Sequence, residues 1–117
     1  MRFVLLPLVI FFTAPGCAVG VACTEEARSS VTVHVTDAAG TALQGATVSY
    51  TVDGGASTPC DDLGDAFVCA YEVDGAFVIR VEADGYEPRD VEVNVGRTAD
   101  DCHVESEVLD VALTPVA

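Results

Sequence analysis

From Ser30 onward, apolar and polar residues alternate along the chain with a period of two. The alternating stretches are 31–36, 47–52, 67–71, 77–83, 91–95 and 104–113. Such alternation is typical of strands that bury one face, and glycine or aspartate stands at nearly every break. No stretch repeats its apolar residues at helical spacing. The sequence therefore predicts an all-β fold, a single antiparallel Greek-key β-sandwich of about seven strands. A change of phase at Val108–Leu109 predicts a bulge in the last strand.

The N-terminus has the features of an export signal. Met1-Arg2 supplies a short positive region, and an apolar run follows from residue 3 to residue 12, broken at Pro7. Ten residues are too few to span a bilayer, which takes about twenty, but they suit the apolar region of a secretory signal. Pro7 and Pro15 argue against a buried core helix. We therefore assign residues 1–16 to a signal peptide.

The residues before Cys17 resemble a bacterial lipobox, in which a small residue precedes a cysteine that is acylated and becomes the mature N-terminus. Gly16-Cys17 fits this pattern, whereas Ala14 and Pro15 stand where leucine and alanine or serine are usual. This interpretation predicts lipidation at Cys17, a short tether over residues 17–29 and a folded domain over residues 30–117. The acyl chains would then bind the membrane while the domain stays in solution.

Two further inferences concern location. Ala18, rather than aspartate, follows Cys17, which under the common Gram-negative sorting rule favours the outer membrane of the cell envelope. The alternative to lipidation is ordinary cleavage after Gly16, Gly20 or Ala22, which gives a secreted or periplasmic protein. Cleavage after Gly16 would leave an odd thiol in an oxidising compartment, which is unfavourable.

Four cysteines follow Cys17, at positions 23, 60, 69 and 102, and four cysteines allow three pairings. Cys60 and Cys69 have the spacing of a short hairpin stapled at its ends. Cys23 precedes the first predicted strand and Cys102 precedes the last, so adjacent edge strands would bring them together. We therefore predict the disulfides Cys23–Cys102 and Cys60–Cys69. A metal site with His34 or His103 is the rival interpretation, but the chain has no Cys-x-x-Cys or His-x-His spacing.

The charge of the chain excludes one class of partner. Five arginines and no lysine stand against nineteen acidic residues, for a formal net charge of −14. Beyond residue 16 there are four arginines and all nineteen acidic residues, a net charge of −15. Nucleic-acid binding needs clustered cationic side chains, so no nucleic-acid partner is expected. The same charge keeps the domain off an anionic membrane surface and favours a soluble monomer.

Two motifs resemble the carboxypeptidase regulatory-like domains, which are transthyretin-like (prealbumin-like) β-sandwiches. The stretch 31–48, VTVHVTDAAGTALQGATV, has the strand, D-x-x-G turn and G-A-x-V entry of that family, without the common proline at Ala42 or Leu43. The stretch 75–86, GAFVIRVEADGY, resembles its glycine-started strand and Gly-Tyr turn. The end of the chain, from Cys102 to Pro115, is similar to small exported members. The resemblance covers Ser30 to Pro115 and implies a fold rather than an activity.

Catalysis is not expected. His34 falls on the polar face of its strand and His103 precedes the last strand, with no nucleophile placed beside either by the sequence. Related transthyretin-like hydrolases end in a Tyr-Arg-Gly-Ser signature, whereas this chain ends in LTPVA. Zinc carboxypeptidases carry such a sandwich only as an accessory domain. No catalytic residue and no cofactor are therefore assigned.

Three carboxylates, Asp61, Asp62 and Asp65, stand within five residues of an expected loop. Oxygen ligands on such a loop make a weak calcium candidate, because the spacing of an EF-hand is missing. A solvated acidic face is the simpler interpretation. The expected function is that of a non-catalytic, lipid-anchored envelope protein with a structural role or an unidentified protein or glycan partner. The alternative is a soluble secreted binding module, carbohydrate-binding or calcium-dependent.

Overall fold

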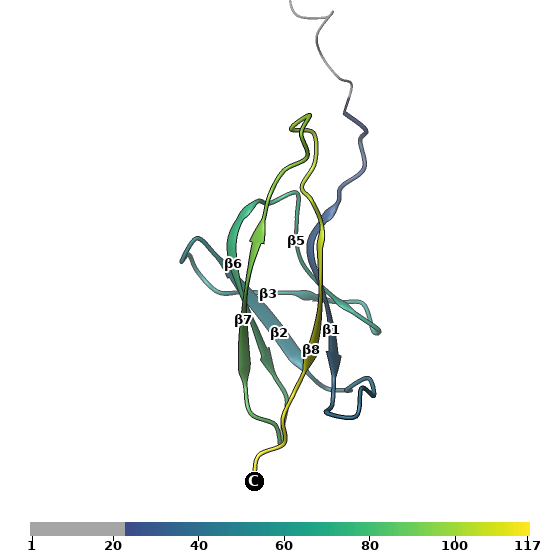
Figure 1. The fold of residues 1–117 in the computed structure, drawn as a ribbon, viewed down its shortest axis with the longest axis vertical. Helices are drawn as coiled ribbons and strands as arrows, with labels where there is room; N and C mark the ends of the chain where they lie inside the picture. The colour runs from purple at the N-terminus through teal and green to yellow at the C-terminus, as the bar shows by residue number, and fades with distance from the viewer. Residues whose placement is uncertain (1–22) are drawn as a thin grey trace, which may run out of the picture.

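The computed structural model describes residues 23–117 as two four-stranded sheets packed face to face, with no helix in that range (Figure 1). The strands are β1 (Ser29–Thr36), β2 (Thr47–Val52), β3 (Thr58–Pro59), β4 (Asp61–Asp62), β5 (Phe67–Tyr71), β6 (Gly75–Glu82), β7 (Arg89–Val95) and β8 (Glu107–Ala112). This confirms the all-β sandwich. The count of eight exceeds the expected seven because the segment between β2 and β5 contributes two strands of two residues each.

The first sheet has the order β4-β5-β1-β8, and the second has the order β3-β2-β6-β7. Every pair is antiparallel except β1 and β8, which run parallel from Val31 opposite Glu107 to Thr36 opposite Ala112. The expected antiparallel pairing is therefore wrong at this one place. A parallel pair needs a long crossover, and here the whole of the second sheet lies between the two strands in sequence. β8 is an edge strand, but β1 is interior.

The expected bulge in the last strand is also wrong. β8 pairs with β1 residue by residue from Glu107 to Ala112 without an insertion. Val108 is 62% exposed and Leu109 is half-buried against the core, so the alternation keeps its phase. The apparent change of phase arose because Val108, although apolar, lies on the outer face.

The core consists mainly of β-branched side chains from the inner faces of both sheets. Phe77, which is 1% exposed, lies against Tyr50 with 5.6 Å between ring centroids. The other core residues with no more than 1% exposure are Val31, Val33, Cys69, Ile79, Val81, Val104, Val111 and Leu113. They come from four of the strands and from the segments beside β8, so the packing of one sheet on the other buries them together.

The predicted turns are formed by the residues that the sequence singled out. Asp37 accepts hydrogen bonds from the N–H groups of Ala39 and Thr41, both at 2.9 Å, and Gly40 has a φ of 84°. Gly75 begins β6 with a φ of 139°, and a Cβ there would lie 2.9 Å from Val52 Cγ1. Glycine is therefore favoured at position 40 by its backbone conformation and at position 75 also by the lack of space for a Cβ.

The two ends of the sandwich carry different segments. The residues that lead into β1 lie beside the β7–β8 loop at one end, while the β1–β2 loop, the β6–β7 turn and the C-terminus lie at the other (Figure 1). Among the described residues, no helix is long and apolar enough to cross a membrane. The predicted signal peptide and Cys17 lie outside the described residues.

Candidate functional site

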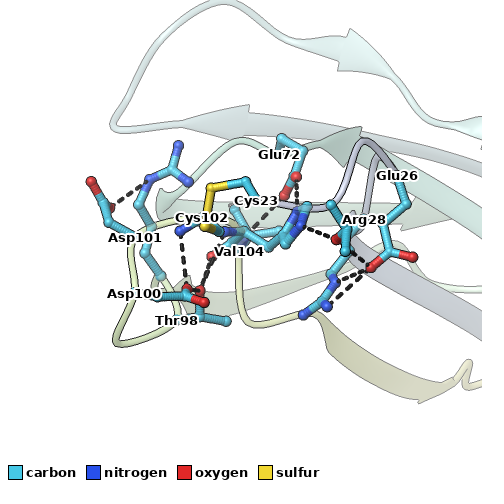
Figure 2. Close-up of a disulfide and its surroundings, with 12 residues drawn as sticks. Cys23, Glu26, Arg28, Glu72, Thr98, Asp100, Asp101, Cys102 and Val104 are labelled. Carbon is cyan, nitrogen blue, oxygen red and sulfur yellow. Dashed lines mark hydrogen bonds and ion pairs between the residues drawn. A yellow bond between two sulfur atoms is a disulfide. The ribbon is translucent and has the colours of Figure 1, made fainter. Parts of the chain in front are cut away.

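The functional candidate with the most complete geometry lies where the chain enters the sandwich. We call residues 23–28 the entry segment. Its first residue, Cys23, forms a disulfide with Cys102 of the β7–β8 loop, with 5.2 Å between the Cα atoms (Figure 2). The bridge spans a sequence separation of 79 residues. It therefore fixes the start of the domain to a loop that lies far along the chain.

His103, next to this disulfide, is 5% exposed and is bonded at both ring nitrogens. Its Nδ1 contacts a carboxylate oxygen of Glu72, and its Nε2 lies 2.8 Å from the hydroxyl of Thr24. Thr98 fixes the backbone of the same residue, because its N–H donates to the His103 carbonyl at 2.8 Å. The imidazole ring thus joins the entry segment to the β5–β6 turn.

Glu72 connects three parts of this end. Its side chain accepts the backbone N–H of Val104 at 2.9 Å as well as the contact from His103. Its own N–H donates to the carbonyl of Arg28 at 2.9 Å. The backbone of Glu72 has a φ of 54°, a conformation that is costly for a residue with a side chain and that the surrounding contacts must maintain.

Two other carboxylates at this end are held by neighbours. Glu26 accepts hydrogen bonds from the Arg28 guanidinium at 3.1 Å and from the Thr24 hydroxyl at 3.0 Å. Asp100 accepts from the Thr98 hydroxyl and, at 3.1 Å, from the backbone N–H of Cys102. These contacts lower the pKa of both carboxyl groups, chiefly through Arg28 for Glu26 and through Thr98 for Asp100.

The pKa of Glu72 is lowered too, first by the Val104 N–H and then by His103. All three carboxyls therefore bind protons more weakly in the folded state than in the unfolded chain, so they contribute stability above their unfolded pKa. We expect the melting temperature to fall as the pH drops from about 4.5, the ordinary value for glutamate, through the lower folded-state values. Glu72→Gln should reduce this acid dependence in thermal melts at pH 3–6. Glu87→Gln, at the opposite end, should leave it unchanged, and equal effects would contradict the assignment.

The predicted disulfide pairing agrees with the structure. Cys60 and Cys69 are joined across the β4–β5 hairpin with 4.5 Å between Cα atoms, and Cys23 is joined to Cys102. All four cysteines of the described residues are therefore used. The rival metal site is not formed, since no group of three or more His, Cys, Asp or Glu side chains within residues 23–117 is placed to hold a metal ion.

The sequence placed His34 correctly on the polar face of its strand, but it did not indicate the contacts of His103. His34 lies on the outer face of β1, half-buried, with Nδ1 3.3 Å from the carbonyl of Asp65. His103, in contrast, is neither solvated nor alone, and the Thr24 hydroxyl beside it was missed. The link joins residues 79 apart in sequence, so only the disulfide prediction, which places Thr24 and His103 one residue beyond each cysteine, could have suggested it.

The carboxylates of the weak calcium candidate do not gather. Asp61 and Asp62 are exposed on β4, and Asp65 follows in the hairpin turn. Asp62 uses its carboxylate to accept the N–H of Gly64 at 2.8 Å, which stabilises the turn. This segment therefore forms a stapled hairpin with a polar surface.

A shallow groove of about 400 Å³ lies at the end opposite the entry segment. Its lining comes from the start of β2 and from the β6–β7 turn, and it includes Glu82, Asp84 and Tyr86. Tyr86 bridges to Pro115 and packs partly against the core, as expected for a ring that caps the end of the sandwich. Glu82 is paired with Arg80 at 2.9 Å.

No protein-family model and no curated protein matches this sequence. Among solved structures, the fold is similar to 3-chlorocatechol 1,2-dioxygenase from Rhodococcus opacus 1CP, with a TM-score of 0.50 and 8% sequence identity. The match covers 90% of this chain and 70% of that chain. At this identity the likeness shows the fold alone.

The order Thr24–His103–Glu72 has the connectivity of a hydroxyl, imidazole and carboxylate relay. The hydroxyl proton of Thr24, however, is directed at Glu26, a carboxylate that can only accept. An imidazole that donates to the hydroxyl oxygen cannot also remove its proton. The arrangement as it stands therefore favours a role in holding the entry segment over one in nucleophilic catalysis.

Proposed function

We propose that the chain is a non-catalytic cell-envelope lipoprotein, attached to the outer membrane through acylated Cys17, whose carboxypeptidase regulatory-like sandwich has a structural or partner-binding role. The observation that carries the proposal is the use of the cysteines. Two disulfides suggest an oxidising environment outside the cytoplasm, and they consume four of the five cysteines. The fifth is Cys17, which the short segment 13–16 separates from the apolar run.

The geometry of the two ends supports the same proposal. The entry segment lies in the second half of the predicted tether, so a lipid at Cys17 places the β7–β8 loop toward the membrane. The end with the groove beside Tyr86 then faces away and is available to a protein or glycan partner (Figure 1). Close to neutral pH the acidic domain is repelled by anionic headgroups, which favours this upright arrangement.

We expect Cys17→Ser to move the protein from the detergent phase to the aqueous phase in phase-partitioning experiments, or to stall its processing. The reason is that the acyl chains require the thiol, whereas the eight strands and both disulfides that the structure describes lie at or after Cys23. Ala18→Ser introduces the same side chain one position later and should leave partitioning unchanged. Intact mass of the wild-type protein provides the direct measurement. An unmodified mature chain that begins after Gly20 or Ala22 would overturn the lipoprotein proposal and favour the soluble secreted module.

A further inference from the structure

The contacts around His103 determine which atoms carry protons. Thr24 has one hydroxyl proton, and its oxygen lies 3.0 Å from Glu26 Oε1 and 2.8 Å from His103 Nε2. A carboxylate only accepts, so Thr24 must donate to Glu26. His103 Nε2 must then be the donor toward the Thr24 oxygen. On the other side of the ring, Nδ1 meets the carboxylate of Glu72 and must also donate. All three contacts are therefore satisfied at once only when both ring nitrogens carry a proton.

The carboxylates of Glu26 and Glu72 are suited to accept these hydrogen bonds. Hydrogen bonds from Arg28 and Thr24 lower the pKa of Glu26, and those from Val104 and His103 lower that of Glu72. Both are therefore ionised near neutral pH and act only as acceptors. His103 is 5% exposed, so little water is available to replace a hydrogen bond that its ring gives up.

The other charged groups at this end come from three segments. Glu26 and Arg28 belong to the entry segment, and Glu72 belongs to the β5–β6 turn. Asp100, on the β7–β8 loop, is negative and close enough for His103 to lower its pKa slightly. Arg97 of the same loop is occupied by ion pairs to Asp74 at 3.3 Å and Asp101 at 3.6 Å. The net surroundings of the imidazole are anionic, as a cationic ring requires.

We propose that His103 is a proton-dependent latch that docks the entry segment on the sandwich. With two protons, the ring bonds Glu72 and Thr24 at once, and Thr24 still satisfies Glu26. When the ring loses a proton, one of these three hydrogen bonds must break, because only two protons remain for the three bonds. Retaining the contact to Glu72 leaves Nε2 without its proton, so the link to Thr24 or that from Thr24 to Glu26 is lost.

The latch acts beside the covalent lock formed by Cys23 and Cys102. With the disulfide intact, deprotonation loosens the entry segment but leaves its first residue attached. With the disulfide reduced as well, the chain can detach up to the start of β1 at Ser29. Six residues add roughly 20 Å of reach at about 3.3–3.6 Å per residue. The latch and the disulfide together therefore set how far the sandwich can lie from the point at which its N-terminus is held.

The test uses the 15N-labelled full-length chain between pH 4 and pH 9. The ring nitrogens of His103, distinguished from those of His34 with the variant His34→Gln, report protonation. Amide hydrogen exchange of Glu72, whose N–H donates to the carbonyl of Arg28 at 2.9 Å, reports docking of the entry segment. We expect both nitrogens to be protonated at the acidic end of the ring titration. On deprotonation, protection of the Glu72 amide should fall about tenfold after correction for intrinsic exchange, the scale of one hydrogen bond to a charged group.

Three variants separate the latch from a general effect of pH. Thr24→Val should abolish the dependence of exchange on ring protonation and leave the Glu72 amide weakly protected throughout. In Glu26→Gln the amide can donate to the Thr24 oxygen, which frees the hydroxyl proton for a neutral ring, so protection should persist above the titration. Glu25→Gln removes the same charge one residue earlier and should behave as the wild type. Protection that stays constant while the wild-type ring titrates would overturn the proposal, as would identical behaviour of the two glutamine variants.

Discussion

Replacing Cys23 and Cys102 together by alanine is expected to lower the free energy of unfolding by about 4 kcal/mol, because the disulfide closes a loop of 79 residues in the unfolded chain. Removing Cys60 and Cys69 in the same way opens a loop of only 9 residues and is expected to cost about 3 kcal/mol in the same entropic model. Urea denaturation at neutral pH measures both losses. The pairs thus serve as controls for each other.

Two outcomes would contradict this prediction. A larger loss from the short-loop pair would mean that native packing around Cys69, which is fully buried, outweighs loop closure. Non-reducing peptide maps that join Cys23 to Cys60 would remove its basis, since the closed loops would then have other lengths. Alanine is used instead of serine because serine would place a hydroxyl in the core at position 69.

Phe77→Ala is expected to destabilise the sandwich by about 3–5 kcal/mol, the range for removing a buried aromatic side chain. Phe77 is 1% exposed and stacks on Tyr50 across the β2–β6 pair, so the substitution leaves a cavity and removes a ring contact. Chemical denaturation provides the measurement. Phe77→Leu should cost less, because it retains most of the volume.

Val108→Ala is the matched surface control for this experiment. Val108 lies on the outer face of β8 with 62% of its surface exposed, and its truncation should change stability by no more than about 0.5 kcal/mol. A loss at Val108 comparable to that at Phe77 would mean that an interface covers β8 in solution. A small loss at Phe77 would contradict the packing of the two sheets described above.

The strands and the Cys60–Cys69 disulfide could be predicted because their causes are local. Valine at every second position indicates which face of β1 is buried, whatever the strand packs against, and the positions of Cys60 and Cys69 follow from one hairpin. β3 and β4 could not be predicted, since two-residue strands carry no period and depend on their neighbours for pairing.

The predictions that were wrong concern features that depend on where a residue or strand lies in the assembled sandwich. Val108 is apolar but exposed, because an edge strand has an outer face that a single sequence does not distinguish from the core. The parallel pairing of β8 with β1 depends on how the intervening sheet folds across the first. His103 is buried beside Glu72, whose side chain reaches it from a turn 31 residues earlier. Its burial and its partners are properties of the assembled end of the sandwich.

The parallel β1–β8 pair also determines how the domain bears mechanical load. The chain enters at the start of β1 and leaves after β8 at the opposite end, so tension between the two ends of the reduced domain pulls these strands in opposite directions and shears their shared ladder (Figure 1). The Cys23–Cys102 bridge changes this path. Force then passes through the sulfur atoms to Cys102 and along β8 to the C-terminus, so the 78 residues inside the loop cannot be stretched. A domain of this design resists extension through a covalent bond, and its other strands lie outside the path of the force.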